Sequence, residues 1–180
     1  NAPAKTLKDI VALAKAKPGT LSFGSAGSGS AQHLALELFK VAAGVDVLHV
    51  PYKGSAPLLT DLMGGQINYS FDTMAAVTPH VKGGKVHAVA QTRTKRSASY
   101  PDLPTVAESG YPGFEATTWY GMIGPARMAS DLVQRINRDI NTAMAMPDVK
   151  ERLNAVGAED GGGTAQQFAD FMRAERVKWA

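Results

Sequence analysis

The residues best suited to chemistry form a run of small side chains in LSFGSAGSGSAQHLALELF, from Leu21 to Phe39. The glycines of this run allow backbone angles that other residues avoid, and they let a ligand approach closely. Free N–H groups and the dipole at the start of the following helical pattern favour a negative group, so the run suits a carboxylate or a phosphate. The alternative is a tight turn in which Ser30 only caps a helix. The candidate binding residues are Ser25, Ala26, Gly27, Ser28, Gly29 and Ser30.

Two further polar loops follow the next two apolar segments of the chain. In a parallel sheet they would share one edge with the glycine-serine run, where α/β proteins bind ligands. Lys53 would attract an anion from a distance or would simply be solvated, and Tyr52 would offer a donor. Asp72 would receive an ammonium group or a water, or would brace its own loop. The candidates from these loops are Tyr52, Lys53, Gly54, Asp72 and Thr73.

Patterns of catalytic, nucleotide and metal sites are missing from the sequence. There is no Walker loop, and Gln32 stands where a dinucleotide fingerprint would want glycine. His33 shares a helix face with Glu37 and Lys40, which is typical of a packing or loop-bracing residue. The four histidines lie on separate segments, with no HExxH and no Gly-x-Ser-x-Gly elbow. We therefore expect no metal, no cofactor and no enzymatic activity.

Composition indicates a globular protein with a buried core. The 180 residues are 44% hydrophobic, 19% charged and 7% aromatic, and the net charge is +3. The basic run at 93–96 lies in a polar segment and favours a solvated loop over a nucleic-acid patch. There is no cysteine, no apolar run long enough to cross a bilayer, and no signal-peptide pattern in the first residues.

Helical and apolar segments alternate in the first two thirds of the chain. Helices are expected at 7–14, 30–42, 55–63 and 74–81, and strands at 20–23, 47–50, 67–71 and 86–91. This order predicts a mainly parallel sheet covered on both faces.

The last third of the chain has a different texture. The proline-rich segment 92–114 reads as a connection with a short helical piece at 105–109, and 116–123 reads as a strand. Helices are expected at 132–144, 149–156 and 168–179, the last behind a capping box of Thr164 and Gln167. These helices have almost no strand to cover. We interpret residues 1–120 as one complete α/β lobe and 121–180 as the C-terminal part of a second lobe; the alternative is a self-contained helical tail.

Four separated motifs carry a family resemblance. They are FGSAGSGSAQHLALELF, VLHVPYKGSAPLLTDLMGGQI, SFDTMAAVTPHVKGGKV and PDLPTVAESGYPGFEATTWYG. Together they resemble the Bug (TctC-like) family of extracytoplasmic solute receptors, which serve tripartite tricarboxylate transporters. The resemblance implies a two-lobed fold of the type II periplasmic binding protein (Venus flytrap) class. Such a fold closes over a small dicarboxylate, tricarboxylate or acidic amino acid.

The resemblance also implies roles for the two parts of the chain. The loop from Ser25 to Ser30 would be the carboxylate loop of the second lobe, and residues 121–180 the helical end of a first lobe whose N-terminal part is absent. Implied partners are a small organic acid and membrane permease subunits, in the periplasm. The charge pattern indicates no nucleic-acid partner, and the apolar stripes of residues 132–179, left uncovered, would allow self-association. Two rivals stay open: the effector-binding domain of a transcription regulator, and an α/β enzyme acting on a small organic acid.

Overall fold

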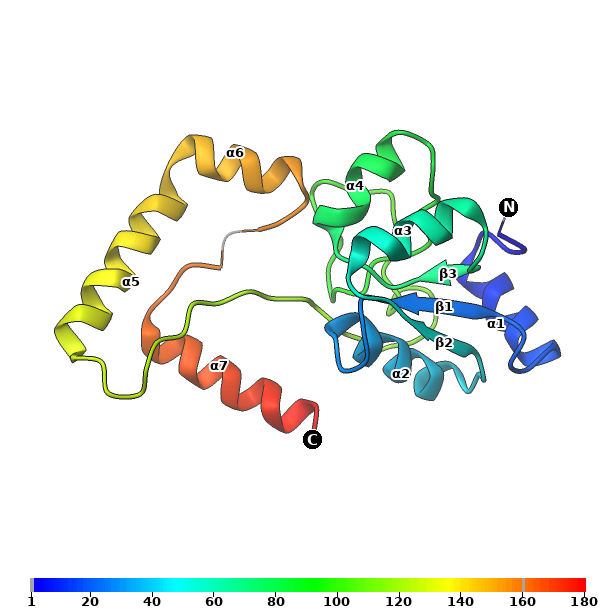
Figure 1. The fold of residues 1–180 in the computed structure, drawn as a ribbon, viewed down its shortest axis with the longest axis horizontal. Helices are drawn as coiled ribbons and strands as arrows, with labels where there is room; N and C mark the ends of the chain where they lie inside the picture. Colours follow the sequence, from blue (N-terminus) through cyan, green and yellow to red (C-terminus); the bar gives the residue numbers. More distant parts are fainter. Residues whose placement is uncertain (1, 160) are drawn as a thin grey trace. The chain divides into compact units, whose positions relative to one another are not determined.

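The computed structural model describes residues 2–159 and 161–180, which form two compact units (Figure 1). The first unit is Asn1–Thr118 and the second is Trp119–Ala180. Each unit is described by itself below.

The first unit is built on a small parallel sheet. Its strands are β1 (Ser22–Ser25), β2 (Leu48–Pro51) and β3 (Tyr69–Ser70), in the order β2-β1-β3 (Figure 1). Phe23 of β1 lies opposite His49 of β2 and Tyr69 of β3. All three strands therefore end at one edge, as the alternating sequence pattern predicts.

Helices precede and separate these strands, close to the predicted ranges. They are α1 (Leu7–Ala16), α2 (Ala31–Ala43), α3 (Ser55–Gly64) and α4 (Met74–Lys82). Thr6 caps α1 by accepting the Asp9 N–H, and α2 ends at Gly44 with a left-handed φ of 59°. Local sequence signals therefore define where these helices begin and end.

Side chains of β1 alternate between the two faces of the sheet, and each face has its own helix. The Phe23 ring lies 6.1 Å from that of Phe39 in α2. A Cβ at Gly24 would point the other way, toward Leu58 of α3 and Ile67. Since α2 and α3 cover opposite faces, the sheet is buried on both sides, as expected for a parallel sheet.

A fourth strand expected at 86–91 is not formed, and this prediction was wrong. Only Gln91 makes a bridge, with Thr105. The Gln91 side chain donates to the carbonyls of Tyr100 and Leu103, and its backbone carbonyl accepts the Val106 N–H. Residues of the 97–106 segment thus form hydrogen bonds with Gln91 in the place where a neighbouring strand of the sheet would have paired.

The predicted strand at 116–123 is also absent, which is a second correction. Ala116 donates its N–H to the Thr92 carbonyl, but the rest of the segment has no partner strand among the described residues. Tyr120 and Ile123 are 84% and 78% exposed. Aromatic and β-branched residues favour strands only where a pleated neighbour packs against them. The 105–109 piece is a single turn, closed by the Ser109 N–H on the Thr105 carbonyl.

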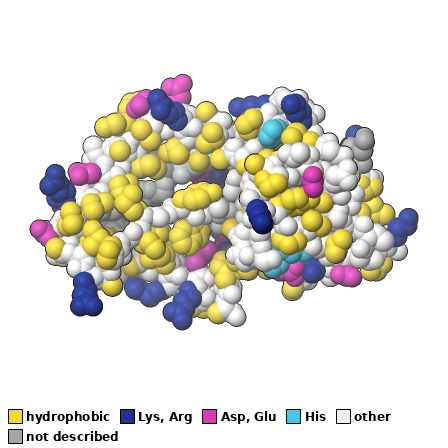
Figure 2. Space-filling model, viewed as in Figure 1, with side chains coloured by type: hydrophobic (Ala, Val, Ile, Leu, Met, Phe, Trp, Pro, Cys, Tyr) yellow, Lys and Arg dark blue, Asp and Glu magenta, His cyan; other side chains and the backbone are white. Residues whose placement is uncertain are grey.

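The second unit is helical. It contains α5 (Ser130–Ala145), α6 (Pro147–Ala155) and α7 (Ala165–Lys178), and Thr164 with Gln167 forms the predicted capping box before α7. The Trp119 ring packs against Phe168 and Phe171 of α7. None of the described residues of the three helices is buried, and Figure 2 shows hydrophobic side chains on their surface.

Within residues 2–159 and 161–180, no helix combines the length and the apolar character that crossing a bilayer requires.

Candidate functional site

Three loops meet at the edge where the strands end. The Tyr52 N–H after β2 donates to the Ser25 carbonyl at 2.9 Å. From the start of α2, Gln32 Nε2 reaches Asp72 Oδ1, after β3, at 3.4 Å. The structure therefore brings together the three loops that the sequence placed at one edge.

The tip of the 25–30 loop presents backbone amides. Gly27 and Gly29 have φ values of 137° and 79°, which glycine adopts without strain. The backbone N–H groups of Ser28, Ala31 and Gln32 have no acceptor among the residues that the structure describes. The last two belong to the first turn of α2, where the helix dipole also favours an anion.

Ser30 is the N-cap of α2. Its hydroxyl oxygen accepts the His33 N–H at 3.2 Å, and its own N–H donates to the Gly27 carbonyl at 3.2 Å. The capping alternative considered from the sequence is thus present. Capping uses the oxygen as an acceptor and leaves the Ser30 hydroxyl proton available to a ligand.

Ser25 faces into the protein. Its side chain is fully buried, and its oxygen accepts the Gly27 N–H at 3.2 Å and lies 2.7 Å from His49 Nε2. The hydroxyl also lies within hydrogen-bond distance of the Gly27 carbonyl. Its hydrogen-bonding groups are therefore used in holding the loop.

Two histidines brace this loop from the α2 side of the sheet. His33 Nδ1 accepts the Gly29 N–H at 3.1 Å, and the His33 ring stacks on that of His49 with centroids 4.1 Å apart. Burial lowers the pKa of His49, and the neighbouring His33 ring lowers it further. His33 is thus a loop-bracing residue, one of the two roles expected for it.

The 52–54 loop is tied to the glycine-serine loop through its backbone. The Gly54 N–H donates to the Ala26 carbonyl at 3.2 Å. The Tyr52 hydroxyl donates to Asp61 Oδ2 at 2.9 Å, and burial, followed by this bond, raises the pKa of Tyr52. Lys53 is exposed. Tyr52 therefore braces α3, while Lys53 is open to solvent.

Asp72 mainly holds its own surroundings together. Its Oδ1 accepts from the Ser55 hydroxyl and the Thr73 N–H, both at 2.7 Å. Thr73 caps α4 by accepting the Ala76 N–H. Asp72 Oδ2 is buried without a partner among the described residues. An unpaired buried carboxylate oxygen is costly, so this atom calls for a donor such as a water or a ligand group.

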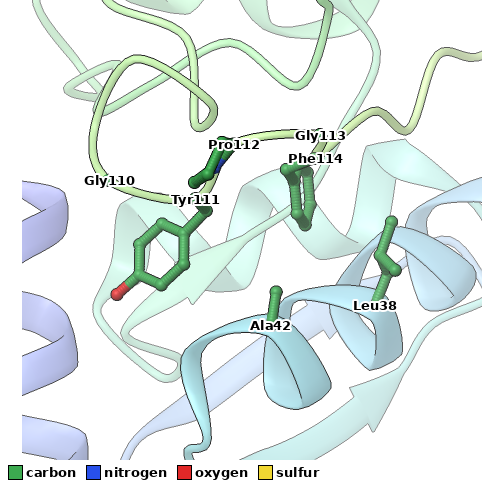
Figure 3. A pocket seen from close by; sticks show the side chains of 7 residues that line it. All are labelled: Leu38, Ala42, Gly110, Tyr111, Pro112, Gly113 and Phe114. Atoms are coloured by element: carbon green, nitrogen blue, oxygen red, sulfur yellow. The ribbon is translucent and has the colours of Figure 1, made fainter.

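A separate cavity lies away from these loops. A pocket of ≈340 Å³ is formed where Tyr111, Pro112 and Phe114 lie over Leu38 and Ala42 of α2 (Figure 3). Leu38 is about two helical turns from the start of α2. This apolar pocket therefore does not include the amide-presenting loop. Among the described residues, no cluster of His, Asp and Glu has the geometry of a metal site.

Sequence reasoning missed three contributors to the site: Gln32, Ser55 and His49. Gln32 and Ser55 both donate to Asp72. Each lies near the start of a helix, which is the only signal that the sequence offered. The role of His49 depends on its register beside β1, which no local pattern reveals.

A parallel sheet with helices on both faces and an edge that presents amides is typical of the α/β folds that bind small ligands. The chain belongs to the tripartite tricarboxylate transporter family of receptors (TctC), whose family model matches residues 1–180. The predicted family and fold class are thereby confirmed. The family is one of receptors rather than enzymes.

Two curated relatives illustrate the match. A UPF0065 protein in the tcbD-tcbE intergenic region of Pseudomonas sp. (strain P51) is 39% identical over 176 residues, covering 96% of this chain and 52% of the relative. Protein BugT of Bordetella pertussis is 35% identical over 175 residues, covering 97% and 54%. The chain thus spans about half the length of these relatives.

Two solved structures share the fold. R. palustris Rpa4515 with adipate has a TM-score of 0.93 and 34% identity, over 98% of this chain and 59% of that one. MatC (Rpa3494) from Rhodopseudomonas palustris with bound malate has a TM-score of 0.88 and 28% identity, over 98% and 61%. The first of these structures is with adipate and the second with bound malate, and both acids are dicarboxylates.

Proposed function

We propose that this chain carries the carboxylate-binding edge of an extracytoplasmic receptor that captures a small carboxylate and delivers it to a tripartite tricarboxylate transporter. The observation that supports it most is the set of N–H groups at Ser28, Ala31 and Gln32, which lack acceptors among the described residues. Backbone amides arranged around a turn and a helix start make a concave site for anions. The adipate and malate in the neighbouring structures fit this choice of ligand.

The site residues have different tasks in this function. Ser28 and Ser30 donate to the carboxylate, Ser25 holds the loop, and the backbone of Ala26, Gly27 and Gly29 shapes it. Exposed Lys53 attracts the anion from a distance. The open oxygen of Asp72 receives a bound water or a hydroxyl or ammonium group of the ligand. Tyr52, Gly54 and Thr73 keep the neighbouring loops in place.

Gly29→Ala tests the loop, with Gly65→Ala as a matched control. Both glycines have left-handed φ values, 79° and 76°, and a Cβ at either would meet no atom within 4 Å. Each change therefore carries the same backbone strain, about 1–2 kcal/mol. We expect equal losses of thermal stability but a more than tenfold loss of adipate or malate affinity only in Gly29→Ala.

The measurement is isothermal titration calorimetry on the full-length protein with a panel of small dicarboxylates. Equal affinities for the two variants would remove the loop from the site. A wild-type protein that binds none of the acids would overturn the proposed function itself.

The transport role has its own assay. Uptake of the labelled acid should fail in cells that lack the gene and return with wild type but not with Gly29→Ala, and the protein should fractionate with the periplasm. Normal uptake without the gene would contradict the proposal. Self-association through α5, α6 and α7 stays a prediction, which sedimentation velocity of the full-length protein checks.

A further inference from the structure

We propose that His33 and His49 are positioning residues that hold the 25–30 loop in its binding geometry, and that protonation of His33 breaks its part of this brace, so that acid weakens carboxylate capture. The affinity part of this inference rests on the proposed function. The part that concerns the loop geometry does not depend on the proposed function and is tested by NMR without a ligand.

The contact between His33 and Gly29 requires an unprotonated nitrogen. His33 Nδ1 accepts the Gly29 N–H at 3.1 Å, and a neutral imidazole has one nitrogen that can accept. A protonated ring carries N–H groups on both nitrogens, so it would turn a second donor toward the Gly29 N–H. The hydrogen bond is then lost and the two groups repel.

Loss of this contact acts on the part of the loop that presents amides. Gly29 lies between Ser28, whose N–H has no acceptor among the described residues, and Ser30, which caps α2. Gly29 adopts a φ of 79° and, as glycine, has many other conformations open to it once released. A ligand must then order the loop on binding, and affinity falls by that cost.

His49 stacks on His33 and also contacts Ser25, the first residue of the 25–30 loop. Its Nε2 lies 2.7 Å from the Ser25 hydroxyl oxygen, which accepts the Gly27 N–H. Its ring is nearly parallel to that of His33, at 16° and 4.1 Å between centroids. Two positive charges at this separation oppose each other, so protonation of one ring opposes protonation of the other.

The surroundings favour a neutral His49. Burial lowers its pKa, and so do His33 and Lys40, while Glu37 raises it. Among the described residues, the charged groups that act on the His49 ring are thus Glu37 and Lys40 of α2 and, once protonated, His33.

Glu37 also limits the opposite effect that a protonated ring would have. A positive ring near the loop would attract an anionic ligand. Glu37 Oε1 lies 3.8 Å from His33 Nε2, close enough to pair with that ring once it is protonated, and Lys40 Nζ lies 3.1 Å from Glu37 Oε2. Lys40 already pairs with Glu37, so Glu37 offsets only part of the new charge. For acid to weaken capture, the loss of the Gly29 contact must outweigh the remaining attraction for an anion.

His33→Asn separates the brace from its titration. Asn Oδ1 occupies nearly the position of His Nδ1, accepts the same N–H and takes up no proton in this range. We expect wild type to bind adipate or malate about tenfold more weakly at about pH 5.5 than at about pH 7.5, across the usual histidine range. His33→Asn should keep the affinity at neutral pH. It should show only the smaller change that protonation of the ligand itself produces.

A spectroscopic experiment tests the brace without a ligand. In the unliganded full-length protein, the Gly29 amide NMR resonance should shift with the same midpoint as the His33 ring. In His33→Asn this shift should be absent, because Asn takes up no proton in this range. A constant Gly29 resonance through the His33 titration, or an unchanged affinity profile in His33→Asn, would overturn the inference. Titration of Gly29 in a protein that binds no carboxylate would instead count against the proposed function and leave the brace standing.

Discussion

Replacing Gly24 with alanine should destabilise the first unit by a predictable amount. Gly24 lies in β1, and a Cβ there would come within 2.6 Å of Ile67 Cδ1 and 3.1 Å of Leu58 Cγ. Leu58 is fully buried and Ile67 is 4% exposed, so neither has free space to enter. Overpacking of a closed core costs about 1–3 kcal/mol. We take about 2 kcal/mol, because the Ile67 methyl can rotate while Leu58 sits between α3 and the sheet.

This cost corresponds to a fall of about 6–8 °C in melting temperature for a unit of this size. Differential scanning calorimetry of the full-length protein measures it. Gly64→Ala is the matched control: Gly64 ends α3, and its added Cβ would meet no atom within 4 Å. It should be neutral or stabilising by up to about 1 kcal/mol. A melting temperature unchanged by Gly24→Ala would show that α3 does not pack against β1 as described.

Three further changes have expected outcomes. Gly121→Ala should destabilise the second unit, because the new Cβ would collide with the Phe168 ring, whereas Gly161→Ala, in open space, should not. Amide hydrogen exchange in the second unit measures the difference. Equal exchange rates in the two variants would contradict the packing of Gly121 against Phe168. Thr164→Ala removes the capping hydroxyl of α7 and should lower the free energy of unfolding, measured in urea, by about 1 kcal/mol. An unchanged free energy of unfolding would show that the cap is not formed in solution. Because the folded-state pKa of His49 is lowered, its neutral form contributes stability above the unfolded value of 6.5 that is lost as pH falls through the folded value. The urea midpoint of wild type should therefore fall with acidification in that window, and that of His49→Gln should fall less; parallel profiles would exclude this role.

Helix boundaries could be predicted well from the sequence because the signals that set them are local. Thr6, Ser30 and Thr164 each accept an N–H three residues later, and Gly44 closes α2 in a left-handed conformation. These contacts depend on nearby residues only. The local sequence therefore contains all the information that is needed to place these helix ends.

Strands were predicted less well because each depends on a distant partner. The apolar segments at 86–91 and 116–123 have the composition of strands, yet among the described residues no neighbouring strand pairs with them. Composition reports how well a residue fits a half-buried pleated surface and cannot supply that surface.

In the candidate site, too, one part could be predicted from the sequence and another could not. Its loops could be placed at one edge from the order of strands and helices. The duties of single side chains could not, because Ser25 turns inward to His49 and Asp72 spends one oxygen on Ser55. Both orientations follow from strand register and rotamers, which sequence spacing does not determine.

The position of β1 at the centre of the sheet has a consequence for biosynthesis. Both of its partners, β2 and β3, lie within residues 22–70, so the sheet can close before residues 119–180 leave the ribosome. Chains fold unit by unit as they emerge. The edge that carries the 25–30 loop can thus be assembled, with its amides already aligned, while residues 119–180 are still being translated.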